Sequence, residues 1–237
     1  MLGDVIQANC RAQFTADDFS FVVSTLAKSP RDAVSLVSLL SDESERDSIL
    51  DHDLVYDSLV DRDGCLRVSA AFYFYVLTRR VLRRVSLDER ALTDYVAAVL
   101  LAFSHVNQLQ RPGESEPTAR SFTYVSDLIA QLNTCAPEQV FLLRAHLGNY
   151  TLFFSGLFAE RVHSHAQRRG APGLSFYDAV GQSSYLAVAR HPQAKRSDLQ
   201  AVFEQLGGEF RRVRLALNDL ADTLLHFHAP PAIVRSA

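Results

Sequence analysis

Lysine and cysteine are scarce in this sequence of 237 residues. The three cysteines, Cys10, Cys65 and Cys135, are odd in number and widely spaced, which excludes a disulfide framework and a zinc knuckle. Lys28 and Lys195 are the only lysines, so the other 22 of the 24 basic residues are arginine. Codon usage in a GC-rich genome explains this bias most simply. Recognition of phosphate or carboxylate groups by the planar guanidinium is the alternative.

The sequence also lacks the signals that direct a chain to a membrane. Residues 1–10 have no basic segment, and Asp4 interrupts any apolar run there, so no signal peptide is predicted. The most apolar stretch, 140–158, contains Arg144, His146 and Asn149, each of which is costly in lipid. This pattern predicts a buried core helix and no membrane span. We therefore expect a cytoplasmic protein.

No catalytic template is present in the chain. A glycine-rich phosphate loop, a G-x-S-x-G elbow and an H-E-x-x-H helix are all missing. The net charge of −3 provides no general attraction to nucleic acid or to anionic membranes. An enzyme is therefore not the leading expectation. No cofactor is predicted, and a transition metal is the alternative.

Helix signals, in contrast, occur along the whole chain. Thr15 and Asp18 form a capping box, and Ser29-Pro30 ends one helix and begins the next. Apolar residues recur at helical spacing over 92–106, and no stretch alternates apolar and polar residues as a strand would. The sequence predicts an all-α fold of about 10–12 helices with mixed antiparallel and orthogonal packing.

Residues 1–237 are expected to form a single helical domain, and the loop 107–120 is the place where two lobes would divide. Within this domain a helix is expected over 66–84, followed by a capping box of Ser86 and Glu89. Ser197 is expected to cap a helix that ends at Gly207-Gly208. Gly181 is expected to allow a neighbouring helix to approach closely.

The metal candidates lie on two helices. Glu160 and His163 are one turn apart, as in di-iron carboxylate bundles, and the last helix repeats this spacing with Asp219, Asp222 and His226. If the two helices pack face to face, these ligands could converge. The competing interpretation is a solvated helix face, because apolar residues occupy the opposite side of the last helix.

The basic candidates are Arg79, Arg80, Arg83 and Arg84, which form a dense patch at the end of a helix. The acidic stretch 42–63 lies nearby in the sequence and holds nine acidic and two basic side chains. We expect the arginines to pair with acidic groups, either within the chain or on a protein partner or a second copy. Nucleic acid is the less favoured ligand, because no recognition motif accompanies the patch. Arg211, Arg212 and Arg214 are expected to form a solvated start to the last helix.

The third set of candidates lies on the apolar helix 140–158 and comprises Arg144, His146, Asn149 and Ser155. An apolar pocket with a few polar groups is the usual site for a small molecule. The alternative is that these side chains bond to neighbouring backbone and fix the packing.

Three functions follow from these candidates. The leading expectation is a non-enzymatic interaction or regulatory protein of the bacterial cytoplasm. The second is a metal-dependent helical-bundle enzyme that uses Glu160, His163, Asp222 and His226. The third is a helical pocket for a small apolar ligand around His146 and Asn149.

Overall fold

A computed structural model describes residues 5–61, 67–108 and 117–228. Within these ranges the chain forms twelve α-helices and one short 3-10 turn, with no strand, which confirms the predicted all-α fold. In chain order the elements are η1 (Arg11–Gln13), α1 (Ala16–Leu26), α2 (Pro30–Ser41), α3 (Glu43–Leu50), α4 (Asp53–Val60), α5 (Ala70–Arg84), α6 (Arg90–Gln108), α7 (Pro117–Leu132), α8 (Pro137–Leu157), α9 (Ala159–Arg169), α10 (Leu174–Ala189), α11 (Pro192–Arg196) and α12 (Gln200–His228).

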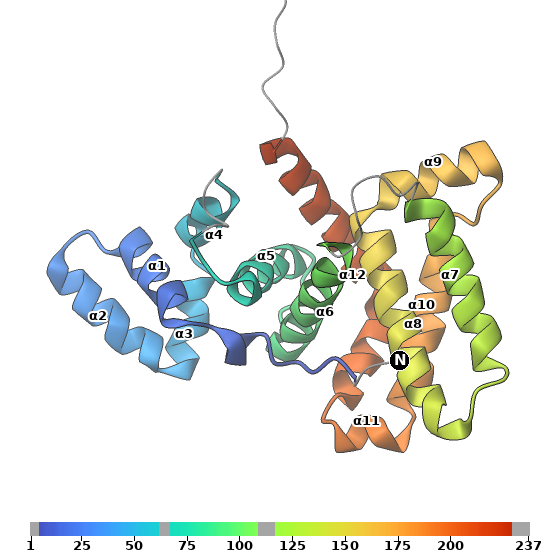
Figure 1. The fold of residues 1–237 in the computed structure, drawn as a ribbon. Coiled ribbons are helices and arrows are strands. Elements are labelled where there is room, and N and C mark those ends of the chain that lie inside the picture. The colour runs from blue at the N-terminus through green and yellow to red at the C-terminus, as the bar shows by residue number, and fades with distance from the viewer. Residues whose placement is uncertain (1–4, 62–66, 109–116, 229–237) are drawn as a thin grey trace, which may run out of the picture.

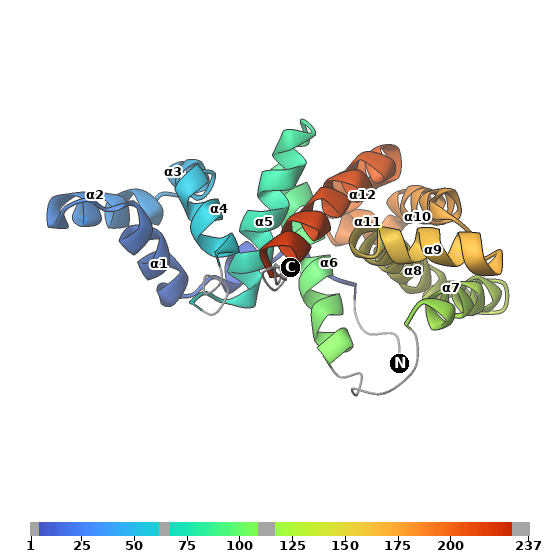
Figure 2. The same ribbon diagram turned by 90° about the horizontal axis from the view of Figure 1, so that it is seen from above.

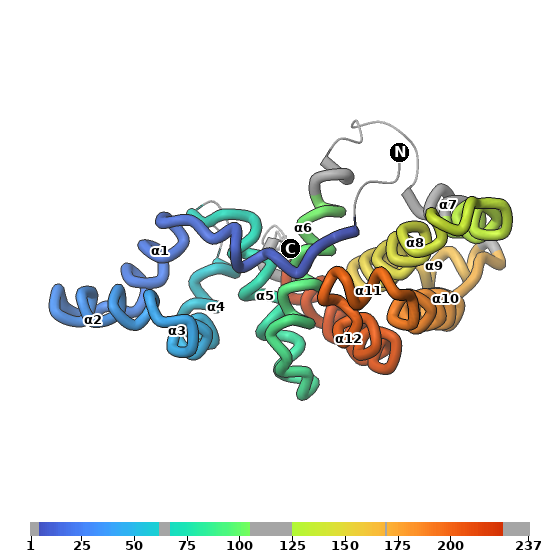
Figure 3. The backbone as a smooth tube through the Cα atoms, turned by 90° about the horizontal axis from the view of Figure 1, so that it is seen from below, coloured from blue at the N-terminus to red at the C-terminus, as the bar shows by residue number. Residues whose placement is uncertain are grey.

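The helices follow one another along an elongated molecule (Figures 1 and 2). Helices α1–α4 occupy one end, helices α7–α10 occupy the other, and α5, α6 and α12 lie between them. The view from below shows the same order and places the segment that leads to α1 across the middle of the molecule (Figure 3). Helices α8, α10 and α12 pack on one another, and α5 packs on both α6 and α12. The main apolar core contains buried residues of α1–α6, α8 and α10–α12, and a second, smaller core joins α7 and α9 to α8 and α10.

The start of the first helix confirms its predicted capping box. The backbone N–H of Thr15 donates to the Asp18 carboxylate at 2.7 Å, and the N–H of Asp18 donates to the Thr15 hydroxyl at 3.3 Å. The fully buried Asp18 carboxylate also accepts bonds from the N–H and the hydroxyl of Ser69, at 2.6 and 2.7 Å. Because Ser69 in turn caps α5, that helix begins at Ala70. One carboxylate therefore joins the starts of two helices.

The helix boundary expected at Gly207-Gly208 is a kink within α12, where the backbone of Glu209 leaves the helical conformation. Helix α12 continues through Gly207-Gly208 with a local kink at Glu209, and Ser197 instead follows the end of α11. A Cβ at Gly207 would lie 2.6 Å from the Leu186 side chain, so this glycine allows close packing against α10 and does not stop the helix.

The prediction for Gly181 is confirmed by the contact between α10 and α12. A Cβ at this position would lie 2.2 Å from the ring of Phe210, which is itself almost fully buried. The two helices can approach this closely only because no side chain separates them.

Candidate functional site

The arginines of the basic patch come from the last two turns of α5. The chain leaves this helix through Ser86, whose φ of 58° is left-handed, and the backbone N–H groups of Ser86 and Leu87 donate to Arg83 and Leu82 carbonyls at 3.0 Å. This is the bonding pattern that closes a helix C-terminus. The predicted capping box of Ser86 and Glu89 is therefore wrong, because Ser86 ends α5 and α6 begins only at Arg90.

Arg79 faces inward and joins three parts of the chain. Its guanidinium binds both oxygens of Asp51 at 3.0 and 3.1 Å, and it also binds the carboxylate and the carbonyl of Asp88 at 2.5 and 2.6 Å. Only 6% of the residue is exposed. Burial would lower the pKa of Arg79, but the bonds to Asp51 outweigh it and raise the pKa. Arg79 is therefore occupied within the chain and holds α3, α5 and the segment before α6 together.

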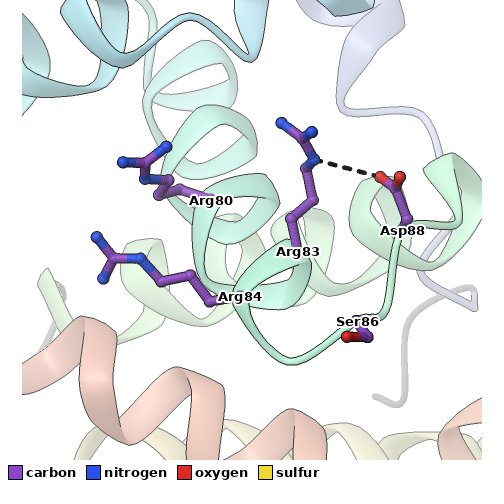
Figure 4. Close-up of a pocket in the computed structure, with 5 residues that line it drawn as sticks. All are labelled: Arg80, Arg83, Arg84, Ser86 and Asp88. Atoms are coloured by element: carbon purple, nitrogen blue, oxygen red, sulfur yellow. Dashed lines mark ion pairs between the residues drawn. The ribbon is translucent and has the colours of Figure 1, made fainter.

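The other three arginines line an open depression of about 490 Å³, together with Ser86 and Asp88. These five residues, Arg80, Arg83, Arg84, Ser86 and Asp88, are called the arginine depression below. Figure 4 shows Arg80 and Arg84 extending in the same direction from α5, while Arg83 turns toward Asp88. The depression thus presents three guanidinium groups from a single helix end.

The three guanidinium groups differ in how well they are paired. Arg80 binds Asp53, and Arg83 binds Asp51 at 3.1 Å and Asp88 at 3.5 Å. Arg84 is exposed and has no carboxylate within ion-pair distance among the described residues. The side chains of Asp53 and Asp88 are themselves 69% and 66% exposed. The acidic stretch therefore meets the basic patch within one chain, and the pairing leaves Arg84 available.

Tyr56 of α4 packs beneath this charged surface. The Arg80 guanidinium lies over its ring, 5.4 Å from the ring centre. Burial raises the pKa of the Tyr56 hydroxyl, while Arg84 and Arg80 lower it and Asp57 raises it. Asp57 is exposed on α4, one helical turn after Asp53, which binds Arg80.

Among the residues that the structure describes, the metal candidates on α9 and α12 form no common site. Glu160 and His163 are exposed on α9, where His163 shares a hydrogen bond of 2.8 Å with Gln167. Asp219 and Asp222 are exposed on α12, and the side chain of His226 lies outside the described residues. Across the described ranges, no three His, Cys, Asp or Glu side chains gather where they could hold a metal.

Asn149 of the apolar helix lies at the centre of a hydrogen-bond network that joins three helices. Its side-chain oxygen accepts bonds from the hydroxyls of Tyr95 on α6, at 2.9 Å, and Tyr185 on α10, at 2.7 Å. Burial raises the pKa of both tyrosines, so both remain protonated donors. The acceptor oxygen of Asn149 is thus satisfied by side chains of two other helices, whereas the packing alternative expected a bond to neighbouring backbone.

The other three candidates on α8 are buried or half-buried. Ser155 is buried and donates to the Thr151 carbonyl at 2.6 Å. His146 is half-buried and lies 5.7 Å from the ring of Phe103, and burial lowers the pKa of His146. Arg144 is also half-buried. The two hydrogen bonds that the Asn149 oxygen accepts come from tyrosines and not from these side chains.

A buried ion pair on α12 was not predicted from the sequence. Arg214 is only 4% exposed and binds both oxygens of Asp178 on α10, at 2.6 and 3.1 Å, and also binds Asn218. The expectation that it is solvated was therefore wrong. Helical spacing offered a signal, since Arg214 lies one turn from the buried residues Phe210 and Leu217 on the same face.

Comparison with known proteins identifies no similar protein. No family model matches the chain, and it matches no curated protein and no solved structure. No described helix has both the length and the apolar content needed to cross a membrane.

Proposed function

We propose that this chain is a non-enzymatic interaction protein of the bacterial cytoplasm, and that it binds an acidic group of a protein partner in the arginine depression. The observation that supports this proposal is Arg84, an exposed guanidinium beside two others, with no carboxylate partner among the described residues. Interactions of a charged group with an oppositely charged partner are favourable where the group is not already neutralised within its own chain.

The ion pairs that Asp53 and Asp88 form at the depression are easy to replace. Both carboxylates are mostly exposed, and exposed ion pairs contribute only about 0–1 kcal/mol. An incoming acidic group can therefore compete with Asp53 for Arg80 and with Asp88 for Arg83, which keeps its pair with the less exposed Asp51. It can use Arg84 without displacing a carboxylate of the described residues. Arg79, in contrast, is buried in its pairs and serves to position the end of α5.

The surroundings of the depression favour a protein partner over nucleic acid. Residues 1–63 carry 13 acidic and five basic side chains, whereas residues 64–237 carry 14 acidic and 19 basic ones. The acidic part includes α4, which lies against α5 beside the depression. A long polyanion would be repelled there, while a partner with one local acidic group would not.

The test is a titration with a short, blocked peptide that contains two adjacent glutamates. Binding is followed by NMR through the arginine side-chain Nε–Hε signals, which detect weak complexes. We expect the signals of Arg80, Arg83 and Arg84 to shift, and the shifts to weaken as salt rises, because exposed charges are screened over about 8 Å at physiological ionic strength.

The matched variants are Arg84→Gln and Arg190→Gln. Arg190 is an exposed arginine at the end of α10 and does not line the depression, so its replacement should leave the titration unchanged. Arg84→Gln should abolish it. Equal effects of the two variants, or no shift in the unmodified protein, would contradict the proposed function.

A further inference from the structure

The arginine depression is bordered by exposed carboxylates of α4, so opposite charges lie side by side on one surface. Asp53 binds Arg80, and Asp57 lies one turn further along α4 and is exposed. The buried Tyr56 lies on the same helix as these carboxylates, and the Arg80 guanidinium covers its ring. A ligand at this surface meets a basic pocket and an acidic margin at the same time.

The basic pocket suits a phosphate better than a carboxylate. Arg83 and Arg84 follow Arg80 by three and four residues, which places both of them beside Arg80 at the end of α5. A phosphate monoester carries about −1.5 to −2 charges at neutral pH and three acceptor oxygens, whereas a carboxylate carries one charge and two oxygens. Three guanidinium groups can therefore be satisfied by one phosphate, and planar guanidinium forks match its oxygens.

Ser86 adds a hydroxyl to the wall of the same pocket. Its φ of 58° is a conformation that glycine adopts more readily, yet a serine occupies the position. The position itself requires only the left-handed backbone that closes α5. The hydroxyl is exposed in the depression, where it can donate a further hydrogen bond to a phosphate oxygen.

We propose that the arginine depression binds the phosphate of a phosphorylated segment of a protein partner, and that Asp53 and Asp57 bind a basic residue next to that phosphate. This inference rests on the proposed function and specifies the acidic group. Asp53 holds Arg80 while the site is empty, and it exchanges Arg80 for the basic side chain of the ligand when the phosphate enters. The ligand therefore carries a negative and a positive charge that face the basic depression and the acidic margin, so each of its charges meets the opposite one.

The experiment uses short, blocked peptides of the pattern Ala-Ala-X-Arg-Ala-Ala, with phosphoserine, glutamate or serine at X, titrated by the same NMR signals. We expect phosphoserine to bind at least about tenfold more tightly than glutamate, and serine not to bind. Arg84→Gln should weaken phosphoserine binding by about tenfold or more, while Arg190→Gln should not change it.

Three further variants test the individual contacts. Asp53→Asn should strengthen binding of free phosphate about threefold, because Arg80 loses its competitor. We expect the unmodified protein to bind the arginine-containing peptide about three- to fivefold more tightly than a peptide with alanine in place of that arginine, as one exposed ion pair would allow. Asp57→Asn should remove this preference. Ser86→Gly should weaken phosphoserine binding about two- to threefold without lowering the unfolding temperature, because glycine suits this backbone.

The outcomes separate the two proposals. Equal affinity for the phosphoserine and glutamate peptides overturns the phosphate assignment and leaves the proposed function standing. No binding of either acidic peptide overturns both. If inorganic phosphate binds as tightly as the phosphoserine peptide, the depression is a site for free phosphate and the assignment to a segment of a protein partner is overturned. A single-stranded oligonucleotide that binds more tightly than the phosphoserine peptide also overturns that assignment.

Discussion

Helices α1–α4 and helices α8, α10 and α12 differ in what holds them to their neighbours. The acidic N-terminal helices share the main apolar core with the rest of the chain and are also joined to it by ion pairs, including Asp47 with Arg90 at 2.6 Å and Asp51 with Arg79 at 3.0 Å. Their outer helix, α2, leaves Val34 and Val37 72% and 56% exposed. Directional pairs therefore help to place this end, while part of its apolar surface stays in contact with solvent.

In helices α8, α10 and α12, close packing positions the chain. Gly148, Gly156, Gly181 and Gly207 each lie where a Cβ would press on a side chain of a neighbouring helix. Such interiors leave no room for added atoms, so small changes in volume are strongly felt. The same all-helical pattern is therefore supported by additional ion pairs in one region and by close packing of helices at glycines in the other.

The largest expected effect is in the closely packed region. Gly181→Ala places a Cβ 2.2 Å from the Phe210 ring, so we expect a loss of about 3 kcal/mol or more of unfolding free energy. Urea denaturation measures this loss. Gly208→Ala is the matched control, because no atom lies within 4 Å of its added Cβ, and it should stabilise α12 by up to about 1 kcal/mol. Similar effects of the two changes would show that close packing does not hold this region.

The next effect is at the junction of the two regions. Arg79→Met should cost about 2–3 kcal/mol, because it leaves the largely buried Asp51 with only Arg83 as an ion-pair partner among the described residues. Arg80→Met is the control and should cost less than about 1 kcal/mol, since its pair with Asp53 is exposed. Chemical denaturation compares the two variants. An equal cost for both would mean that burial does not determine the strength of these pairs.

The buried network around Asn149 should have an effect of about 2 kcal/mol. Asn149→Leu leaves the hydroxyls of Tyr95 and Tyr185 without their acceptor inside the core, and a buried unsatisfied donor costs about 1–3 kcal/mol. Replacing both tyrosines with phenylalanine in the Asn149→Leu background should recover part of this loss, as measured by thermal unfolding. No recovery would assign the loss to the shape of Asn149 and not to the unsatisfied hydroxyls.

The smallest effect is expected on the outer face of α2. Val37→Ser should change the unfolding free energy by less than about 0.5 kcal/mol, because the side chain is mostly exposed. Val22→Ala on α1, which is fully buried, should cost about 2 kcal/mol by comparison. Thermal unfolding of both variants tests the contrast. A large loss for Val37→Ser would show that α2 is buried against another surface in solution.

The local features of the chain could be read from its sequence because they depend on neighbouring residues. The capping box of Thr15 and Asp18, and the start of α2 at Ser29-Pro30, involve only a few consecutive positions. The end of α5 at Arg84 was predicted as well, but the role of Ser86 was not. Ser86 and Glu89 match a capping box in sequence, but Ser86 closes the preceding helix in the structure.

The site shows the same division. The sequence located the arginine cluster and its acidic counterpart, but not which arginine pairs with which carboxylate. Arg79 and Arg80 are adjacent in sequence, yet one is buried in two ion pairs and the other lies at the surface. The helical rotation of about 100° per residue separates them, and the packing of α3 and α4 decides which direction is the interior.

The helical class, many of the helix boundaries and the segregation of charge can thus be predicted from the amino-acid sequence. Periodicity, caps and composition act within a turn or two of helix, so they are visible without a fold. Only the tertiary structure decided that Arg214 is buried, that Asn149 serves two tyrosines and that Arg84 is left without a carboxylate among the described residues. Each depends on groups far apart in the chain, because burial and pairing are set by whichever helix comes to lie alongside.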